Sequence, residues 1–120
     1  MQTAEGLIIL SRSTNPDDGT VDMEIMAPTG YIAFDGHFPG KPILPAFAQL
    51  ALIRDLAAIA INRDCRVTMV KKARFMIPLI PERPYRVNLA FRGNENDVEA
   101  AIWDGDEKAA SFRLLLEKTL

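Results

Sequence analysis

The feature that most constrains the fold is residues 46–61, a stretch of 16 residues in which only Gln49, Arg54 and Asp55 are polar. Pro45 precedes this stretch, and proline suits the start of a helix because its missing N–H needs no partner there. A helix of this length is about 24 Å long and too short to span a membrane. Because it is apolar nearly all round, we expect it to be buried. Burial requires a sheet curved around it, or a sheet and a second subunit.

Strand-like segments flank this predicted helix. Val21, Met23 and Ile25 alternate with polar residues, which is typical of a half-buried strand. A turn is predicted at residues 15–19 from Asn-Pro-Asp-Asp-Gly. Further strands are predicted at residues 7–10, 66–75, 83–92, 98–103 and 109–116. No repeat or linker interrupts the chain, so we expect residues 1–120 to form one α+β domain, an antiparallel sheet wrapped around one long buried helix.

Composition excludes several classes of protein. A net charge of -2 argues against a nucleic-acid-binding protein that relies on bulk electrostatics. The single cysteine, Cys65, excludes an internal disulfide, and with a single histidine a Cys/His zinc site is excluded too, so no metal site is expected. No apolar run reaches the roughly 18 residues of a membrane span, and the N-terminus lacks a basic signal region. We therefore expect a cytoplasmic protein in which Cys65 is an inert thiol.

The segment before the predicted helix combines loop-forming and apolar residues. Residues 36–46 read Gly-His-Phe-Pro-Gly-Lys-Pro-Ile-Leu-Pro-Ala, and residues 70–81 read Val-Lys-Lys-Ala-Arg-Phe-Met-Ile-Pro-Leu-Ile-Pro. In both sequence and order these two stretches resemble the hot-dog-fold 3-hydroxyacyl-acyl-carrier-protein dehydratases. The resemblance covers residues 31–90, and the Leu-Pro and Gln-Leu pairs at its centre are similar to the short dehydratases of aryl-polyene-type pathways.

The resemblance implies a function and a set of roles. His37 would be the base that removes a proton from C2 of a 3-hydroxyacyl thioester, since an ordinary histidine pKa of about 6.5 suits this task. The N–H of Ala46, where the family has glycine, would polarise the thioester carbonyl. The substrate would be carried on the phosphopantetheine of an acyl carrier protein or of CoA, with no other cofactor. The expected substrate contacts are Phe38, Pro39, Gly40, Pro45, Phe47, Gln49 and Leu50.

One family residue is missing. The family places Glu or Asp fourteen residues after its histidine, to protonate the leaving hydroxyl, and here that position is Ala51. Asp55 follows one helical turn later, about 6 Å along the axis, and is a possible substitute. Gln49 is not an acid, but it suits positioning a water or the hydroxyl, or hydrogen bonding to a buried backbone group or to the dimer partner. A third source is a partner subunit, because sites in family dimers combine the histidine of one subunit with the acid of the other.

Three functions therefore remain open. The chain is a dehydratase, or a dehydratase-like subunit, of fatty-acid or polyketide-type biosynthesis. Alternatively it is a non-catalytic acyl-thioester-binding subunit of a heterodimer, or a hot-dog thioesterase. The thioesterase is disfavoured because the His-Phe-Pro motif is not typical of that class. Homodimer and heterodimer both stay open, as does a basic surface for an acidic carrier protein formed by Lys71, Lys72, Arg74 and Arg83.

Overall fold

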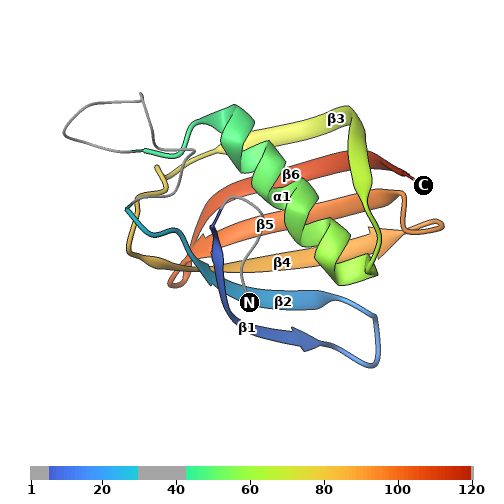
Figure 1. Ribbon diagram of the computed structural model, residues 1–120, viewed down its shortest axis with the longest axis horizontal. Helices are drawn as coiled ribbons and strands as arrows, with labels where there is room; N and C mark the ends of the chain where they lie inside the picture. The colour runs from blue at the N-terminus through green and yellow to red at the C-terminus, as the bar shows by residue number, and fades with distance from the viewer. Residues whose placement is uncertain (1–5, 30–42, 120) are drawn as a thin grey trace.

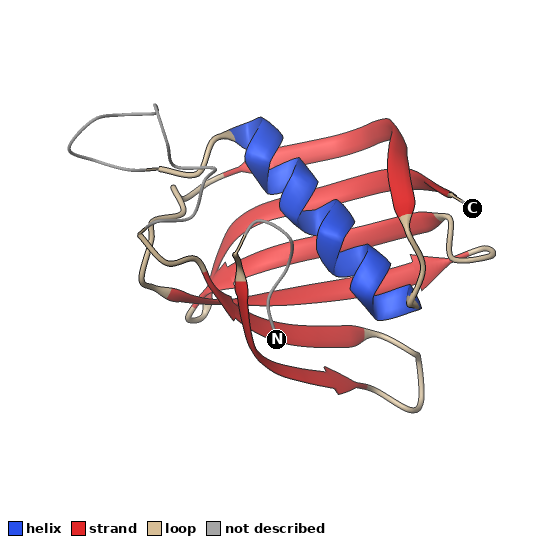
Figure 2. Ribbon diagram, in the orientation of Figure 1, coloured by secondary structure: helices blue, strands red, loops and turns tan. Residues whose placement is uncertain are grey.

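The computed structural model describes residues 6–29 and 43–119, which form a six-stranded antiparallel sheet with one helix across it (Figure 1). The strand order in the sheet is β1-β2-β4-β5-β6-β3. Figure 2 shows the helix lying on one face of a curved sheet, as the sequence predicts. The elements are β1 (Ile8–Thr14), β2 (Val21–Met26), α1 (Ala46–Ile61), β3 (Cys65–Phe75), β4 (Pro84–Arg92), β5 (Asp97–Asp104) and β6 (Glu107–Lys118).

The predicted alternation on β2 places one set of side chains in the core. Val21, Met23 and Ile25 are buried beneath α1, and the residues between them face away from it. The turn before β2 is held by Asn15, whose side chain accepts the N–H of Asp17 at 2.9 Å. The prediction of a half-buried strand preceded by a tight turn is confirmed.

β1 is longer than the sequence predicts. The apolar run ends at Leu10, yet the strand continues to Thr14 with its outer half exposed. Both faces of this half of the strand are exposed to solvent, so its sequence does not alternate between apolar and polar residues. The extension lets Arg12 donate hydrogen bonds to the carbonyls of Ile59 (3.4 Å) and Ala60 (3.2 Å), and this ties the edge of the sheet to the end of α1.

α1 buries one face against the sheet. The buried side chains are Ala48, Gln49, Leu52, Ile53, Leu56 and Ala57. The opposite face, which we call the outward face, includes Phe47, Ala51, Arg54 and Asp55, and all four are partly or largely exposed. A single sheet contacts only one side of a helix, so burial of the outward face requires a second subunit. Within the described ranges, no helix is long and apolar enough to cross a membrane.

We predict that the buried face of α1 carries much of the stability. Leu56 is 0% exposed, and Leu56→Ala should lower the free energy of unfolding by about 2–5 kcal/mol, through lost burial and the cavity left behind. Leu10, which is 47% exposed, offers a matched control, and Leu10→Ala should cost about 1 kcal/mol or less. Urea unfolding measures both. Equal losses would show that α1 is not part of the core.

Candidate functional site

The start of α1 is anchored to the segment that follows β3. Leu44 is buried and donates its N–H to the carbonyl of Leu79 at 2.9 Å. Pro45 is extended (φ -71°, ψ 166°) and caps the helix. Its carbonyl accepts the N–H groups of Ala48 (3.1 Å) and Gln49 (3.0 Å), which begins the helical ladder. The prediction that Pro45 begins the helix is confirmed. The hydrogen bonds of Leu44 and Pro45 fix the position of Ala46, the first residue of the helix.

The N-terminus of α1 is not neutralised by its own residues. Pro45 has no side chain that bonds to the helix, and the first turn contains no acidic residue. The N–H groups of a first turn lack intrahelical acceptors and carry the positive end of the helix dipole. Ala46 is exposed at this point. Its N–H is therefore suited to stabilise negative charge that develops on a substrate oxygen.

A pocket of about 350 Å³ opens beside this helix N-terminus. The N–H groups of Met76 and Ile77 both donate to the carbonyl of Ala109, at 2.8 and 3.0 Å, and this fixes the far wall. The pocket is lined by Ile43, Leu44, Ala46, Gln49, Phe75, Met76, Ile77 and Pro78. Such a lining, apolar with few polar groups, suits an acyl chain attached to a polar head.

Gln49 contributes the polar side chain of this pocket. It is 4% exposed, and its Nε2 donates to the carbonyl of Leu44 at 3.1 Å. Its Oε1 is buried and, among the described residues, has no hydrogen-bond partner. Flipping the amide would set two oxygens against each other, so Oε1 stays the unpaired atom. An unpaired buried acceptor costs about 1–3 kcal/mol, and a ligand hydroxyl or N–H would remove that cost.

The other predicted site residues divide into two groups. His37, Phe38, Pro39 and Gly40 lie outside the described residues. Phe47 and Leu50 do not line the pocket. Phe47 belongs to the outward face and is 63% exposed, whereas Leu50 is partly buried.

Ala51 and Gln49 point in nearly opposite directions. Residues two positions apart in an α-helix are separated by about 200° around its axis. Ala51 is accordingly partly exposed on the outward face, whereas Gln49 is buried. Asp55, one turn later, shares the outward face and forms an ion pair with Arg54 at 3.0 Å. Neither residue lines the pocket at its own helix N-terminus. An acid at either position would therefore point away from this pocket.

The four basic residues predicted as a carrier surface do not gather in one place. Arg83 pairs with Asp104 at 2.9 Å, and Lys71 approaches Asp97 at 3.9 Å. These two carboxylates mark opposite ends of β5, about 23 Å apart at 3.3 Å per residue. Lys72 and Arg74 lie between these ends, exposed on β3. The sequence alone could not predict these positions, because they depend on the order and register of the strands.

Cys65 lies apart from the pocket. Its Sγ donates to the carbonyl of Arg54 at 3.7 Å, and burial raises the pKa of the thiol. A raised pKa leaves less of the reactive thiolate at neutral pH. This agrees with the prediction of an inert thiol.

Comparison with known proteins identifies the family. A family model described as ApeI-like, ApeI dehydratase, matches residues 12–113. The chain belongs to the ApeI-like dehydratase family. Two 3-hydroxyacyl-[acyl-carrier-protein] dehydratases named FabZ are related to it. The one from Desulforamulus reducens is 29% identical over 92 residues, which are 68% of this chain and 65% of the relative. The one from Rhodospirillum rubrum is 32% identical over 73 residues, 51% of this chain and 46% of the relative.

A solved structure confirms the fold. The dehydratase heterocomplex ApeI:P from Xenorhabdus doucetiae superposes with a TM-score of 0.78 at 20% identity, covering 97% of this chain and 98% of that one. The hot-dog fold implied by the sequence resemblance is therefore the fold of this ApeI-like chain. In contrast, the chain spans less than two thirds of either FabZ relative, at 65% and 46% of their lengths.

We predict that Gln49 contributes little to the stability of the chain without ligand. Gln49→Met keeps the length of the side chain and removes the unpaired acceptor together with one hydrogen bond. These effects oppose each other, so the free energy of unfolding without ligand should change by about 1 kcal/mol or less. Urea unfolding measures this. A loss above about 3 kcal/mol would show that Oε1 has a partner within the folded chain.

Proposed function

We propose that this ApeI-like chain is a subunit of a 3-hydroxyacyl-thioester dehydratase in fatty-acid or polyketide-type biosynthesis, and that a partner subunit supplies its acid. One observation carries the proposal. Ala46 and Gln49 line the same apolar pocket, whereas Ala51, at the position of the family acid, lies on the outward face of α1. The chain therefore provides a place for the acyl group and lacks one catalytic group.

The proposed reaction requires three groups around the substrate. His37 removes a proton from C2, and the electron pair forms the C2–C3 double bond as the C3–O bond breaks. The Ala46 N–H stabilises negative charge on the thioester oxygen. The leaving hydroxyl takes a proton and departs as water. Gln49 Oε1 accepts a hydrogen bond from that hydroxyl and holds it in place, but it has no proton to give.

The partner's helix is the proposed source of that proton. The outward face of α1 is apolar apart from the Arg54–Asp55 pair, so a second helix can pack against it. β3 is an edge strand, and Met69 and Val70 on it are exposed, which suits joining of two sheets edge to edge. The related structure from Xenorhabdus doucetiae is a heterocomplex of two different chains. That arrangement supports a heterodimer with an acid-bearing paralogue. A homodimer would cover both surfaces too, but it would supply no acid at this position, because both copies carry Ala51.

The carrier of the substrate is proposed to be phosphopantetheine, on an acyl carrier protein or on CoA. The pocket lining is mostly apolar, and we propose that it holds the acyl chain. The second candidate is a non-catalytic subunit that binds the acyl thioester for an active partner. Ala51 favours this candidate, because alanine cannot act as the acid expected at that position. Both candidates predict binding of the thioester, and turnover separates them.

We predict that an acid at position 51 raises turnover. General acid catalysis contributes about 10²- to 10⁴-fold, so Ala51→Glu should increase the rate of enoyl formation from a 3-hydroxyacyl thioester at least about tenfold, provided that the chain forms a homodimer. Ala51→Gln is the matched control, similar in size but without a labile proton, and should leave the rate unchanged. Enoyl absorbance follows the reaction.

Two further outcomes matter for this experiment. Equal effects of Ala51→Glu and Ala51→Gln, or no effect of either in a dimer, would contradict the proposed position of the acid. Release of free thiol at the same rate as substrate loss would indicate a thioesterase instead. His37→Ala in the Ala51→Glu background should abolish enoyl formation, because the base is then missing.

A further inference from the structure

The sheet face turned away from α1 carries a trough. One row of paired residues crosses five strands on this face, in the order Asp22, Asn88, Ala101, Ser111 and Arg74. The three central side chains of this row are short, and they form the floor. The neighbouring rows carry longer side chains. The trough therefore runs across the strands, from β2 towards β3.

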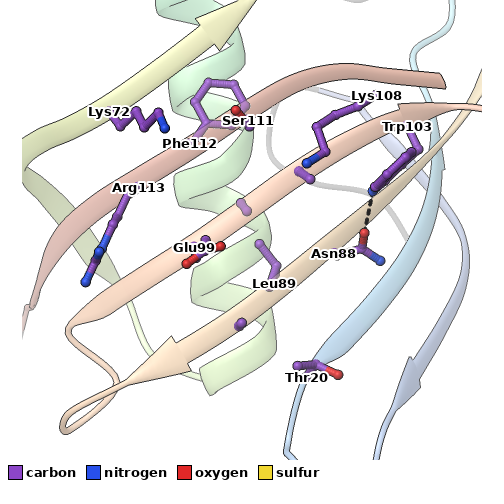
Figure 3. Close-up of a pocket in the computed structure, with 13 residues that line it drawn as sticks. Thr20, Lys72, Asn88, Leu89, Glu99, Trp103, Lys108, Ser111, Phe112 and Arg113 are labelled. Atoms are coloured by element: carbon purple, nitrogen blue, oxygen red, sulfur yellow. Dashed lines mark hydrogen bonds between the residues drawn. The ribbon is translucent and has the colours of Figure 1, made fainter.

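Two walls of long side chains border this floor (Figure 3). Trp103 and Lys108 stand on one side, and Glu99, Arg113 and Lys72 stand on the other. The hollow between them has a volume of about 460 Å³. It lies on the opposite side of the sheet from the pocket beside α1, so the acyl site does not account for it.

Trp103 is held in place as part of the first wall. Its indole N–H donates to Asn88 Oδ1 at 2.5 Å, and the Asn88 amide donates to Asp22. The cationic groups of Arg86 and Lys108 each lie 5.2 Å from the centre of the indole ring, within the range of a cation–π contact. A fixed tryptophan with neighbouring arginine is the composition that interface cores favour.

Positive charge in the trough exceeds what the described carboxylates neutralise. Three of its lining residues, Lys72, Lys108 and Arg113, are cationic, and Glu99 is the lining residue that is acidic. Glu99 is paired with Arg92 at 3.1 Å. Lys72 stands directly opposite Arg113 in the β3–β6 ladder, an arrangement of like charges that is unfavourable without an anion.

Asp97 neutralises part of this positive charge, because its carboxylate forms an ion pair with Arg113 at 3.3 Å. Lys72 and Lys108 have no carboxylate partner among the described residues. The β6–β3 half of the trough is therefore basic, whereas Asp22 makes the β2 end acidic.

The shape of the trough limits what can occupy it. β4, β5 and β6 are interior strands, paired on both sides, so an extended segment cannot add to them through backbone hydrogen bonds. Trp103 and Glu99 are four residues apart on β5, so the Cα atoms from which the two walls rise are about 13 Å apart. An α-helix with side chains is about 10–12 Å wide, so it would rest on the two walls and reach the floor with its side chains. Five strands span about 19 Å, the length of roughly 13 helical residues.

We propose that this trough binds an acidic helix of a partner protein. The helix would lie across β4, β5 and β6, with its carboxylates over Lys72, Lys108 and Arg113 and its apolar side chains against Trp103. This binding surface is independent of the dehydratase proposal, since it uses neither the pocket beside α1 nor the outward face.

Trp103 provides the readout, because it is the only tryptophan in the chain. The probe is a synthetic 15-residue amphipathic helical peptide with glutamate along one face, and the control peptide has lysine in place of glutamate. The glutamate peptide should change the fluorescence of Trp103 in a saturable way. The lysine peptide should leave it unchanged.

Matched double variants test the location. Lys72→Glu with Lys108→Glu should weaken binding of the glutamate peptide at least about tenfold, which corresponds to 1.4 kcal/mol. Arg66→Glu with Lys118→Glu makes the same change in net charge on the same two strands, but these residues pair with Glu117 and Glu95 away from the trough. This control pair should change the affinity less than about twofold. Circular dichroism checks that both doubles are folded.

Several results would overturn the proposal. The first is that the glutamate peptide does not change the fluorescence of Trp103. The second is that the lysine peptide binds as tightly as the glutamate peptide. The third is that the two double variants weaken binding of the glutamate peptide equally. If either double is unfolded, the unmodified chain is titrated at 50 and at 300 mM salt. Binding that does not weaken at the higher salt would then exclude a charge-based site. Equal affinity for inorganic polyphosphate would indicate a general anion surface and would also reject the helix.

Discussion

The packing of α1 across the sheet is the constraint on which the rest of the structure depends. Ile53, Leu56 and Ala57 are fully buried against the strands, so the helix can neither rotate nor slide without exposing them. This fixed rotation directs Gln49 into the pocket and leaves Ala51 on the outward face. The groups proposed to bind the acyl chain and the position proposed for the acid are thus separated by the geometry of one helix, which is why a second subunit enters the proposed mechanism.

Much of the fold follows from local patterns in the sequence. The helix was predicted at the residues where it is found, because its apolar run is bounded by Pro45 and by the Asn62–Asp64 turn. The strand alternation at Val21, Met23 and Ile25 identified the buried face of β2. Each of these signals depends on neighbours within a few residues, where hydrophobic periodicity and turn chemistry are informative.

The sequence was less informative wherever distant segments meet. Strand order and register place β3 at the edge beside β6, and they separate Lys71 from Arg83 by the length of β5. The trough depends on the same register, since its floor joins five strands. Gln49 illustrates an intermediate case. Its bond to the backbone was predicted, but its unpaired Oε1 became visible only once the burial of the site was known. His37 remains a prediction from the resemblance, outside the described residues.

A mixing experiment tests the central claim, that the base and the acid of one site come from two subunits. The two chains are the unmodified protein, which has His37 but no acid at position 51, and the double variant His37→Ala, Ala51→Glu. After co-refolding at equal concentration, enoyl formation should clearly exceed that of either chain alone, because only mixed dimers combine both groups in one site. If the Ala51→Glu chain is active by itself but the mixture is not, base and acid belong to the same chain and the account is wrong.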